Sequence, residues 1–234
     1  MAAATAGNPG SDEPKYVLGL SSSPRRRGNS RLLTEAVLEG AASAGHRTEL
    51  VHLPDCVTTM LRNCRECRKP DGHCSIEDGY RELFFDKVLK ADALVFGTPI
   101  WWYGMAAALK TYFDRMFCYY AASFPDSGMV QRNLMGKRAV LALAAEENNL
   151  SARLGIVHQL QEICRYLHYD LVGVVTGIGN KTGEVTDDPT HPIEAARELG
   201  SRIFRIRVTD YKLDTERPGR VWNEDNTALP AYWR

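Results

Sequence analysis

Five short apolar segments alternate along this chain with longer segments in which apolar residues recur at helical spacing. The short segments, which we expect to be strands, are 15–21, 46–53, 93–97, 138–144 and 169–176. Helices are expected to begin near Ser30 and to cover 77–90, 105–120, 150–167 and 191–206. Strands separated by helices pair in parallel through right-handed crossovers, so both faces of their sheet are covered. The order of the segments therefore predicts an α/β fold with a doubly wound parallel sheet.

The length and composition fit one globular domain. The chain has 234 residues, of which 44% are hydrophobic and 25% are charged, and this is enough for one well-filled core. We expect a disordered arm over 1–14, the domain over 15–208 and a C-terminal extension over 209–234. The aromatic residues that we expect to dock the extension, on its own subunit or on a second one, are Trp222, Tyr232 and Trp233.

Charge and hydropathy exclude several classes of partner. Lys plus Arg and Asp plus Glu both number 29, so the chain has no general affinity for polyanions and no nucleic-acid partner is expected. No apolar run approaches the roughly 18 residues of a membrane span, and residues 1–14 do not resemble a signal peptide. We therefore expect a cytoplasmic protein whose 6 cysteines are thiols or metal ligands.

The segment 97–104 follows the third expected strand and is rich in aromatic residues. Pro99 and the glycines at both ends of the segment indicate a loop. Trp101, Trp102 and Tyr103 are adjacent in it, and a flat aromatic ligand gains from stacking on such side chains. The alternatives are that these aromatics fill the core or form an oligomer contact.

The segment 21–30 follows the first expected strand and opens onto a helix. Its serines and asparagine supply hydroxyl and amide groups, and Arg25, Arg26 and Arg27 supply positive charge. Backbone N–H groups at a helix N-terminus can hold a phosphate. Neither G-x-x-x-x-G-K-[ST] nor G-x-G-x-x-G is present, so a phosphate monoester is favoured. The alternative is that the segment only makes turns and that its arginines are solvated.

A phosphate monoester joined to a flat ring describes FMN. The sequence resembles the flavodoxin-like NAD(P)H-dependent FMN reductases, and within them the iron-sulfur flavoproteins and multimeric flavodoxin-like oxidoreductases. The resemblance rests on SSSPRRRGNS, similar to the phosphate loop G-S-P-R-x-x-G-N-[ST], and on GTPIWWYGMAAALKTYFDR, similar to the flavin loop and the helix after it. It implies the flavodoxin-like strand order 2-1-3-4-5, bound FMN, NAD(P)H as co-substrate and a homodimer or homotetramer.

The resemblance also implies roles for individual residues. Those expected to hold the FMN phosphate are Ser21, Ser23, Arg25, Asn29 and Ser30. Those expected to line the isoalloxazine ring are Thr98, Pro99, Ile100, Trp101, Trp102, Tyr103 and Gly104, and those expected near its far edge are Ala145, Glu146 and Glu147. The family has glycine where Ser22 stands, so Ser22 is the residue that we expect to be most displaced from its family role.

The loop 54–75 contains a cluster of cysteines. Cys64, Cys67 and Cys74 resemble part of the motif through which the cluster-bearing branch of the family binds a [4Fe-4S] centre. The family has a further cysteine two residues after its C-x-x-C, and this chain does not. The residues that could replace it as a fourth ligand are Cys56 and His73. A structural zinc ion and redox-responsive thiols are the alternatives. The cysteines expected to be buried filler on helices are Cys118 and Cys164.

By this resemblance we expect NAD(P)H to pass hydride to bound FMN and to leave before a quinone, a flavin or another small electron acceptor takes its place. No residue is assigned a catalytic role, and His158, His168 and His191 are expected to be structural. Two alternatives stay open. One is an FMN electron-transfer protein, with or without an iron-sulfur cluster, and the other is a specialised FMN-dependent dehydrogenase of one metabolite.

Overall fold

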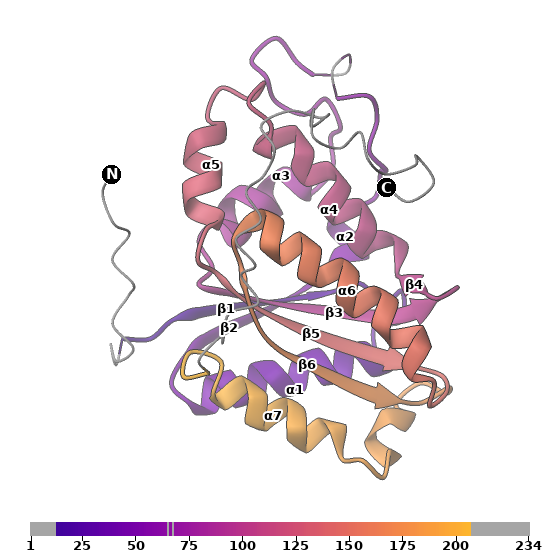
Figure 1. Ribbon diagram of the computed structural model, residues 1–234. Coiled ribbons are helices and arrows are strands. Elements are labelled where there is room, and N and C mark those ends of the chain that lie inside the picture. The colour runs from indigo at the N-terminus through magenta and orange to yellow at the C-terminus, as the bar shows by residue number, and fades with distance from the viewer. Residues whose placement is uncertain (1–12, 65, 67, 207–234) are drawn as a thin grey trace, which may run out of the picture.

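One sheet forms the centre of the computed structural model, which describes residues 13–64, 66 and 68–206 (Figure 1). Its long strands are β1 (Tyr16–Ser21), β2 (Arg47–His52), β3 (Ala93–Trp101), β5 (Arg138–Ala145) and β6 (Asp170–Ile178). They pair in parallel in the order β2-β1-β3-β5-β6, and the short strand β4 (Gly104–Met105) pairs antiparallel with β3. Numbered among themselves, the long strands have the order 2-1-3-4-5, so the predicted doubly wound fold is confirmed.

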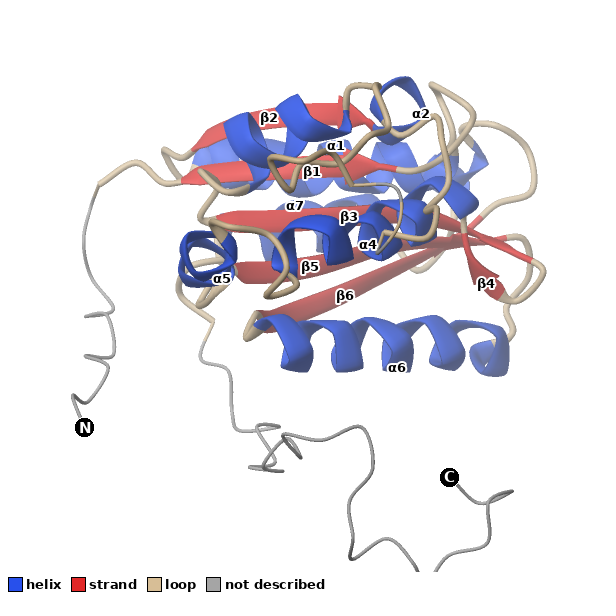
Figure 2. Cartoon of the chain, turned by 90° about the horizontal axis from the view of Figure 1, so that it is seen from above, coloured by secondary structure: helices blue, strands red, loops and turns tan. Residues whose placement is uncertain are grey.

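Helices cover both faces of this sheet (Figure 2). The helices on one face are α1 (Asn29–Ser43) and α7 (Pro192–Ser201). Those on the other face are α4 (Ala107–Tyr120), α6 (Leu150–Leu167) and α3 (Tyr80–Glu82), which continues as the π-helix η1 (Leu83–Val88). The shorter helices are α2 (Leu53–Cys56), α5 (Ser127–Leu134) and the 3-10 helix η2 (Glu184–Asp187).

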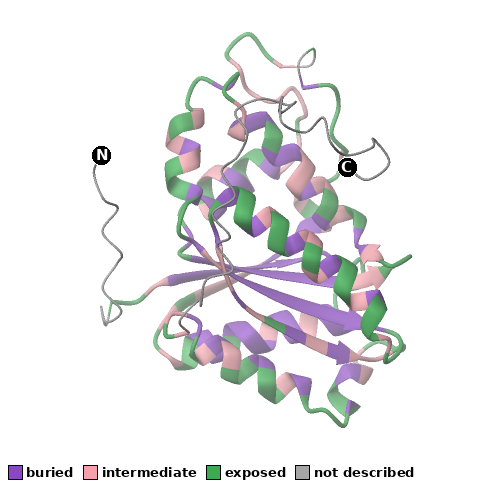
Figure 3. Cartoon of the chain, in the orientation of Figure 1, coloured by how far each residue is buried: buried purple, intermediate pink, exposed green. Residues whose placement is uncertain are grey.

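Alternate residues of the central strands belong to two separate cores, and the strands are buried along most of their length (Figure 3). In β3, Leu94 and Phe96 pack into the core that includes α4 and α6, whereas Ala93 and Val95 pack into the core that includes α1. All four side chains are fully buried. One continuous apolar run therefore serves both faces of the sheet, as expected for a central parallel strand.

The helices α1 and α7 touch through their backbones. A Cβ atom added at Gly40 would lie 2.0 Å from the carbonyl oxygen of Arg197, and one added at Gly200 would lie 2.0 Å from that of Val37. Both distances are far below van der Waals contact, so each helix needs glycine where it meets the other. This contact fixes α1, the helix that follows the first predicted loop, against the rest of its layer.

Three helices differ clearly from the sequence predictions, and one agrees in full. The helix predicted over 191–206 ends at Ser201. The helix predicted over 77–90 begins only at Tyr80, because the Asp78 carboxylate accepts a hydrogen bond from the Tyr80 N–H at 3.2 Å and forms a local turn. Helix α5 was not predicted, since only Val130 and Leu134 of its side chains are buried. Helix α6 has the predicted bounds, with the Asn149 side chain capping its first turn.

Candidate functional site

The turn between β1 and α1 is closed by its own backbone and side chains. Ser21, Ser22 and Ser23 are buried at the carboxyl end of β1. The Arg25 N–H donates to Ser23 Oγ at 3.1 Å. A Cβ atom at Gly28 would lie 2.4 Å from that oxygen, so only glycine fits there. The turn therefore brings the start of α1 against the end of β1.

Two hydroxyl groups at this turn have no partner in the described part of the chain. Ser21 Oγ and Ser30 Oγ are buried, and neither makes a hydrogen bond to another described residue. Such a group is costly unless a ligand satisfies it. The N-cap residue Gly28 supplies no capping side chain, and the first turn of α1 contains no acidic residue. The hydroxyls and the N–H groups of α1 together fit a phosphate.

Arg25 and Asn29, which are predicted to hold the phosphate, and Ser22, which is expected to be displaced from that role, have different surroundings. Arg25 is exposed. The Asn29 side chain donates to two carbonyl groups of the loop after β6, at 2.7 and 3.0 Å, and so ties that loop to α1. Ser22 Oγ donates to the Gly97 carbonyl at 2.8 Å, which joins the ends of β1 and β3. The Asn29 amide therefore joins α1 to the loop after β6, and the Ser22 hydroxyl joins the ends of β1 and β3.

The predicted aromatic loop is a β-hairpin formed by β3 and β4. Trp101 pairs with Gly104, and the two turn residues Trp102 and Tyr103 have φ angles of 47° and 60°. Positive φ at both positions is the geometry of a type I′ turn, which Asn-Gly usually occupies, so two bulky residues hold a strained conformation here. The half-buried residues at the base of the hairpin are Pro99, Ile100 and Gly104.

The hairpin aromatics face solvent. Trp101, Trp102 and Tyr103 are 48%, 94% and 67% exposed, so the alternative that they fill the core is wrong. Large exposed aromatics on a strained turn are typical of a binding site rather than of a structural loop.

Thr98 fixes the hairpin to the helix that follows. Its side chain is fully buried, and its Oγ1 accepts a hydrogen bond from the Ala106 N–H at 2.9 Å and donates to the Pro99 carbonyl at 2.9 Å. Ala106 immediately precedes α4. The hairpin is therefore held at both of its ends.

The register of the sheet brings the predicted segments to one edge. Ser21 pairs with Gly97, and Pro99 pairs with Ala144. The residues at the end of β5 are Ala145, which is buried, and Glu146 and Glu147, which are exposed. Since parallel strands end at a common edge, the predicted phosphate and ring residues lie together on the carboxyl edge, where flavodoxin-type sheets bind ligands (Figure 1).

His52 belongs to this edge but was not predicted from the sequence. It ends β2 and pairs with Ser21 in β1. The residue is buried, and Nδ1 has no hydrogen-bond partner among the described residues. Burial lowers the pKa of His52 despite the nearby Asp55, so the imidazole is neutral at pH 7. Its position as the last residue of an expected strand was the signal that could have identified it.

The described cysteines do not by themselves form a metal site. Cys67 lies outside the described residues, and among those described no three His, Cys, Asp or Glu side chains are arranged to bind a metal. Cys64 is buried and Cys56 is half-buried at the end of α2. Cys118 is buried in the core on α4, as expected, and burial raises its pKa to about 12. The described thiols alone therefore do not fit a [4Fe-4S] centre.

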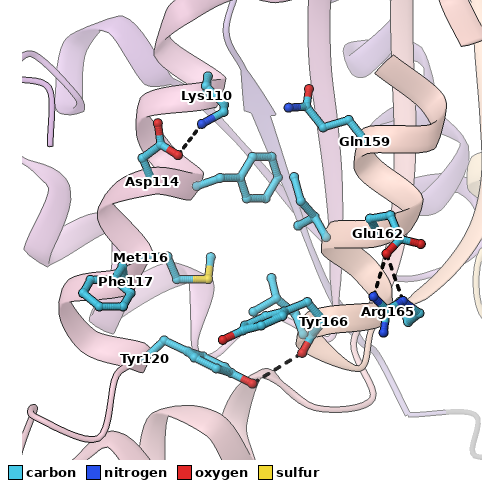
Figure 4. Close-up of a pocket in the computed structure, with 12 residues that line it drawn as sticks. Lys110, Asp114, Met116, Phe117, Tyr120, Gln159, Glu162, Arg165 and Tyr166 are labelled. Atoms are coloured by element: carbon cyan, nitrogen blue, oxygen red, sulfur yellow. Dashed lines mark hydrogen bonds and ion pairs between the residues drawn. The ribbon is translucent and has the colours of Figure 1, made fainter. Parts of the chain in front are cut away.

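A separate hollow lies between α4 and α6 (Figure 4). Its volume is about 460 Å³, and the residues around it include the ion pairs Lys110–Asp114 and Glu162–Arg165. None of the described residues predicted to hold the phosphate or the ring lines it. This hollow is therefore distinct from the candidate site.

The fold and the two turns define a flavodoxin-like protein. A sequence profile of the flavodoxin-like fold matches residues 15–200. The chain therefore belongs to this family, and the resemblance inferred from the two loops is confirmed. An iron-sulfur flavoprotein of Methanocaldococcus jannaschii is 30% identical to it over 81% of this chain and 96% of the relative. A putative NAD(P)H-dependent FMN-containing oxidoreductase of Bacillus subtilis is 25% identical over 75% of this chain and 91% of the relative.

A solved structure shares the fold. The NAD(P)H:quinone oxidoreductase from Methanothermobacter marburgensis aligns with a TM-score of 0.60 at 21% identity and covers 81% of this chain and 96% of that one. Within the described ranges, no helix is both long enough and apolar enough to cross a membrane.

Proposed function

We propose that the protein is an FMN-dependent oxidoreductase that passes hydride from NAD(P)H to a quinone, a flavin or another small electron acceptor. The observation that carries this proposal is the pair of buried, unpartnered hydroxyls of Ser21 and Ser30, on the sheet edge that also bears the aromatic hairpin. The phosphate group of FMN can accept hydrogen bonds from the two hydroxyls, and its flat ring can stack on the aromatic hairpin. When bound, FMN supplies the hydride chemistry, and the protein binds and orients it.

The turn after β1 holds the phosphate in this proposal. Ser21 and Ser30 donate their hydroxyl hydrogens, the first N–H groups of α1 donate alongside them, and Arg25 adds positive charge from the exposed rim. Hydrogen bonds to a phosphate dianion are charge-assisted and therefore strong.

The hairpin holds the ring. Trp101, Trp102 and Tyr103 give the ring a large apolar surface, which loses water when the ring packs against it. Residues 145–147 stand at the far edge of the ring. Excluding water from this face protects the transferred hydride from side reactions.

Anaerobic purification tests flavin binding. The expected visible spectrum has flavin bands, and extraction is expected to release stoichiometric FMN rather than FAD. Steady-state oxidation of NADH or NADPH with a quinone tests the reaction, and ping-pong kinetics are expected because donor and acceptor use the same ring face in turn. A colourless protein that takes up no added FMN would overturn the proposal.

Electron transfer through an iron-sulfur cluster is the second candidate function, favoured by the name of the Methanocaldococcus jannaschii relative. Cys67, one of the three cysteines predicted as its ligands, lies outside the described residues. Iron and acid-labile sulfide, measured per flavin, separate the two candidates. A carrier should contain both and should oxidise almost no NAD(P)H with a quinone.

The proposal extends to assembly and location. We expect a homodimer or homotetramer, as the family resemblance implies, and light scattering on the purified full chain measures its mass. We also expect a cytoplasmic enzyme, because the five described cysteines are all thiols. A monomeric mass at micromolar concentration would refute the oligomer.

A further inference from the structure

The hollow between α4 and α6 is lined mainly by apolar side chains (Figure 4). Met116 on α4 and Leu167 on α6 are buried, whereas Phe117 on α4 and Tyr166 on α6 are exposed. Exposed aromatic surface of this kind marks a contact site, because it loses water when another segment covers it. The volume of about 460 Å³ leaves room for more than one side chain.

The charged residues around the hollow are paired with each other. Lys110 forms an ion pair with Asp114 on α4, and Arg165 Nη2 lies 2.6 Å from a carboxylate oxygen of Glu162 on α6. In the described part of the chain, these four are the charged residues that line the hollow. The rim therefore carries no net charge, and it suits an aromatic, nearly neutral occupant rather than a polyion.

The described chain ends close to this hollow. Arg138 Nη1 donates to the carbonyl groups of Ile203 and Ile206, at 3.0 and 2.5 Å, and so fixes the last described residues at the start of β5. Asp170, the first residue of β6, pairs with Arg138, and neighbouring strands lie about 4.8 Å apart. Leu167, which lines the hollow, comes three residues before Asp170. The next residues of the chain therefore start within a short distance of the hollow.

The C-terminal extension, which lies outside the described residues, has the chemistry that the hollow suits. Residues 207–234 contain five acidic and five basic residues, so their side chains balance in charge. Near their end, the run 228–233 reads ALPAYW and contains no charged residue. Each residue of an extended chain spans about 3.3–3.6 Å, so this run can reach the hollow.

We propose that the hollow between α4 and α6 binds the C-terminal extension of the same chain, with Tyr232 and Trp233 packed against the exposed aromatics Phe117 and Tyr166.

The same chain is favoured over a second copy because of where the extension begins. A segment tethered near its site has a high effective concentration there, and its binding loses little translational freedom. The bound extension would join α4 to α6 on the face of the sheet opposite α1. Its removal should therefore lower the melting temperature, whereas the turn after β1 keeps its contacts.

Limited proteolysis of the full-length protein tests whether the extension is covered. Chymotrypsin cuts after Tyr232 when that side chain is accessible, and mass spectrometry measures the rate at which residues 233–234 are lost. Phe117→Asp places a charge in the hollow. The loss should then become about tenfold faster or more, because cleavage follows the population of the open segment.

Leu154→Asp is the matched control. Leu154 is 54% exposed on α6, much as Phe117 is 48% exposed on α4, but it does not line the hollow. This variant should lose residues 233–234 at the rate of the parent protein. Equal rates in Phe117→Asp and the parent would overturn the proposal.

A photoreactive side chain identifies the site and the chain that supplies the extension. Trp233 is replaced by p-benzoylphenylalanine, the full-length protein is irradiated, and the products are separated on a denaturing gel and mapped. The expected product has the mass of one chain and joins residue 233 to a peptide of α4 or α6 that lines the hollow. A product with the mass of two chains, a cross-link to another surface such as the aromatic hairpin, or no cross-link would each overturn the proposal. None of these measurements involves flavin or NAD(P)H, so the proposed function is tested separately.

Discussion

Substitution of Ser30 tests whether a single hydroxyl group contributes to binding of the FMN phosphate. Because its Oγ is buried without a described partner, Ser30→Ala should leave the melting temperature of the apoprotein unchanged or slightly higher. A hydrogen bond to a charged group contributes about 1.5–3 kcal/mol, so the Kd for FMN should rise roughly 10- to 100-fold. Quenching of FMN fluorescence measures the Kd, and calorimetry measures the melting temperature.

A serine at the other end of α1 is the matched control. The Ser43 hydroxyl donates to the Gly40 carbonyl at 2.7 Å, so Ser43→Ala should affect stability by a few tenths of a kcal/mol and the FMN Kd not at all. Equal FMN affinity in Ser30→Ala and the parent would remove Ser30 from the site.

Asp78 holds the most deeply buried ion pair among the described residues. Its carboxylate accepts a hydrogen bond from Arg115 Nη2 at 2.9 Å, and that guanidinium lies over the Tyr80 ring at 4.4 Å. Leaving one member of a buried pair without its partner costs about 3–5 kcal/mol. Asp78→Asn should therefore lower the free energy of unfolding by about that amount, measured by urea denaturation at pH 7.

The effect should depend on pH. Burial alone would raise the pKa of Asp78, but the hydrogen bonds from Arg115, Thr58 and Tyr80 outweigh burial and hold the pKa below its ordinary value. The carboxylate therefore stabilises the fold above its unfolded pKa of about 4, and this contribution is lost as the pH falls through the lower folded pKa. The gap between parent and Asp78→Asn should shrink below about pH 4. The exposed pair Asp86–Lys90 is the control, and Asp86→Asn should show no such gap.

At the scale of an element, the hairpin of β3 and β4 combines a strained backbone with the proposed binding of the flavin ring. Trp102 and Tyr103 both have positive φ. This backbone conformation destabilises the fold by about 1–2 kcal/mol for each residue. Replacing them by Asn and Gly, the preferred pair for this turn, should raise the melting temperature of the apoprotein by roughly 5 °C. FMN affinity should fall, because the ring loses two aromatic contacts. Phe117→Asn removes another exposed aromatic, from α4, and should give no such rise.

The hairpin result has a clear contrary outcome. A melting temperature below that of the parent would mean that the two aromatics contribute more to the apoprotein than their backbone strain removes. The hairpin would then be a structural element, and the case for its role in binding the ring would fail.

The long elements could be predicted from the sequence because their signals are local. The five long strands follow from apolar runs, and α6 lies where the helical spacing from Leu150 to Leu167 places it. The start of the 77–90 helix could not be predicted, because Asp78 is committed to Arg115, a residue far along the chain. The sequence predicts a loop rather than a hairpin here, because nothing in a Trp-Tyr pair signals positive φ.

The site could be predicted only in outline. Sequence signals placed the two turns on one edge of the sheet, and the register confirms that placement. The internal bonds of Asn29 reach a loop 150 residues away, and the ion pair of Asp78 with Arg115 also joins distant elements. Such partners depend on tertiary packing, which local patterns do not report. Which side chains touch FMN remains a prediction.

At the scale of the whole molecule, binding of FMN should stabilise the native state by mass action. At 100 times its Kd, a ligand that binds only the native state adds about 2.7 kcal/mol, which for a chain of this size is a rise in melting temperature of roughly 5–10 °C. Riboflavin, which has the ring without the phosphate, should give a much smaller shift at the same concentration. Equal shifts for the two flavins would show that the turn after β1 does not bind the phosphate.

Because Gly40 and Gly200 let α1 and α7 meet backbone to backbone, α1 has no room to slide past its neighbour. The aromatic end of the site, in contrast, projects on a hairpin closed by two residue pairs. One end of the cofactor would thus lie against a closely packed helix, and the other against a hairpin whose aromatic side chains face solvent. Retention of the cofactor and tolerance for differently shaped acceptors can therefore change independently during evolution.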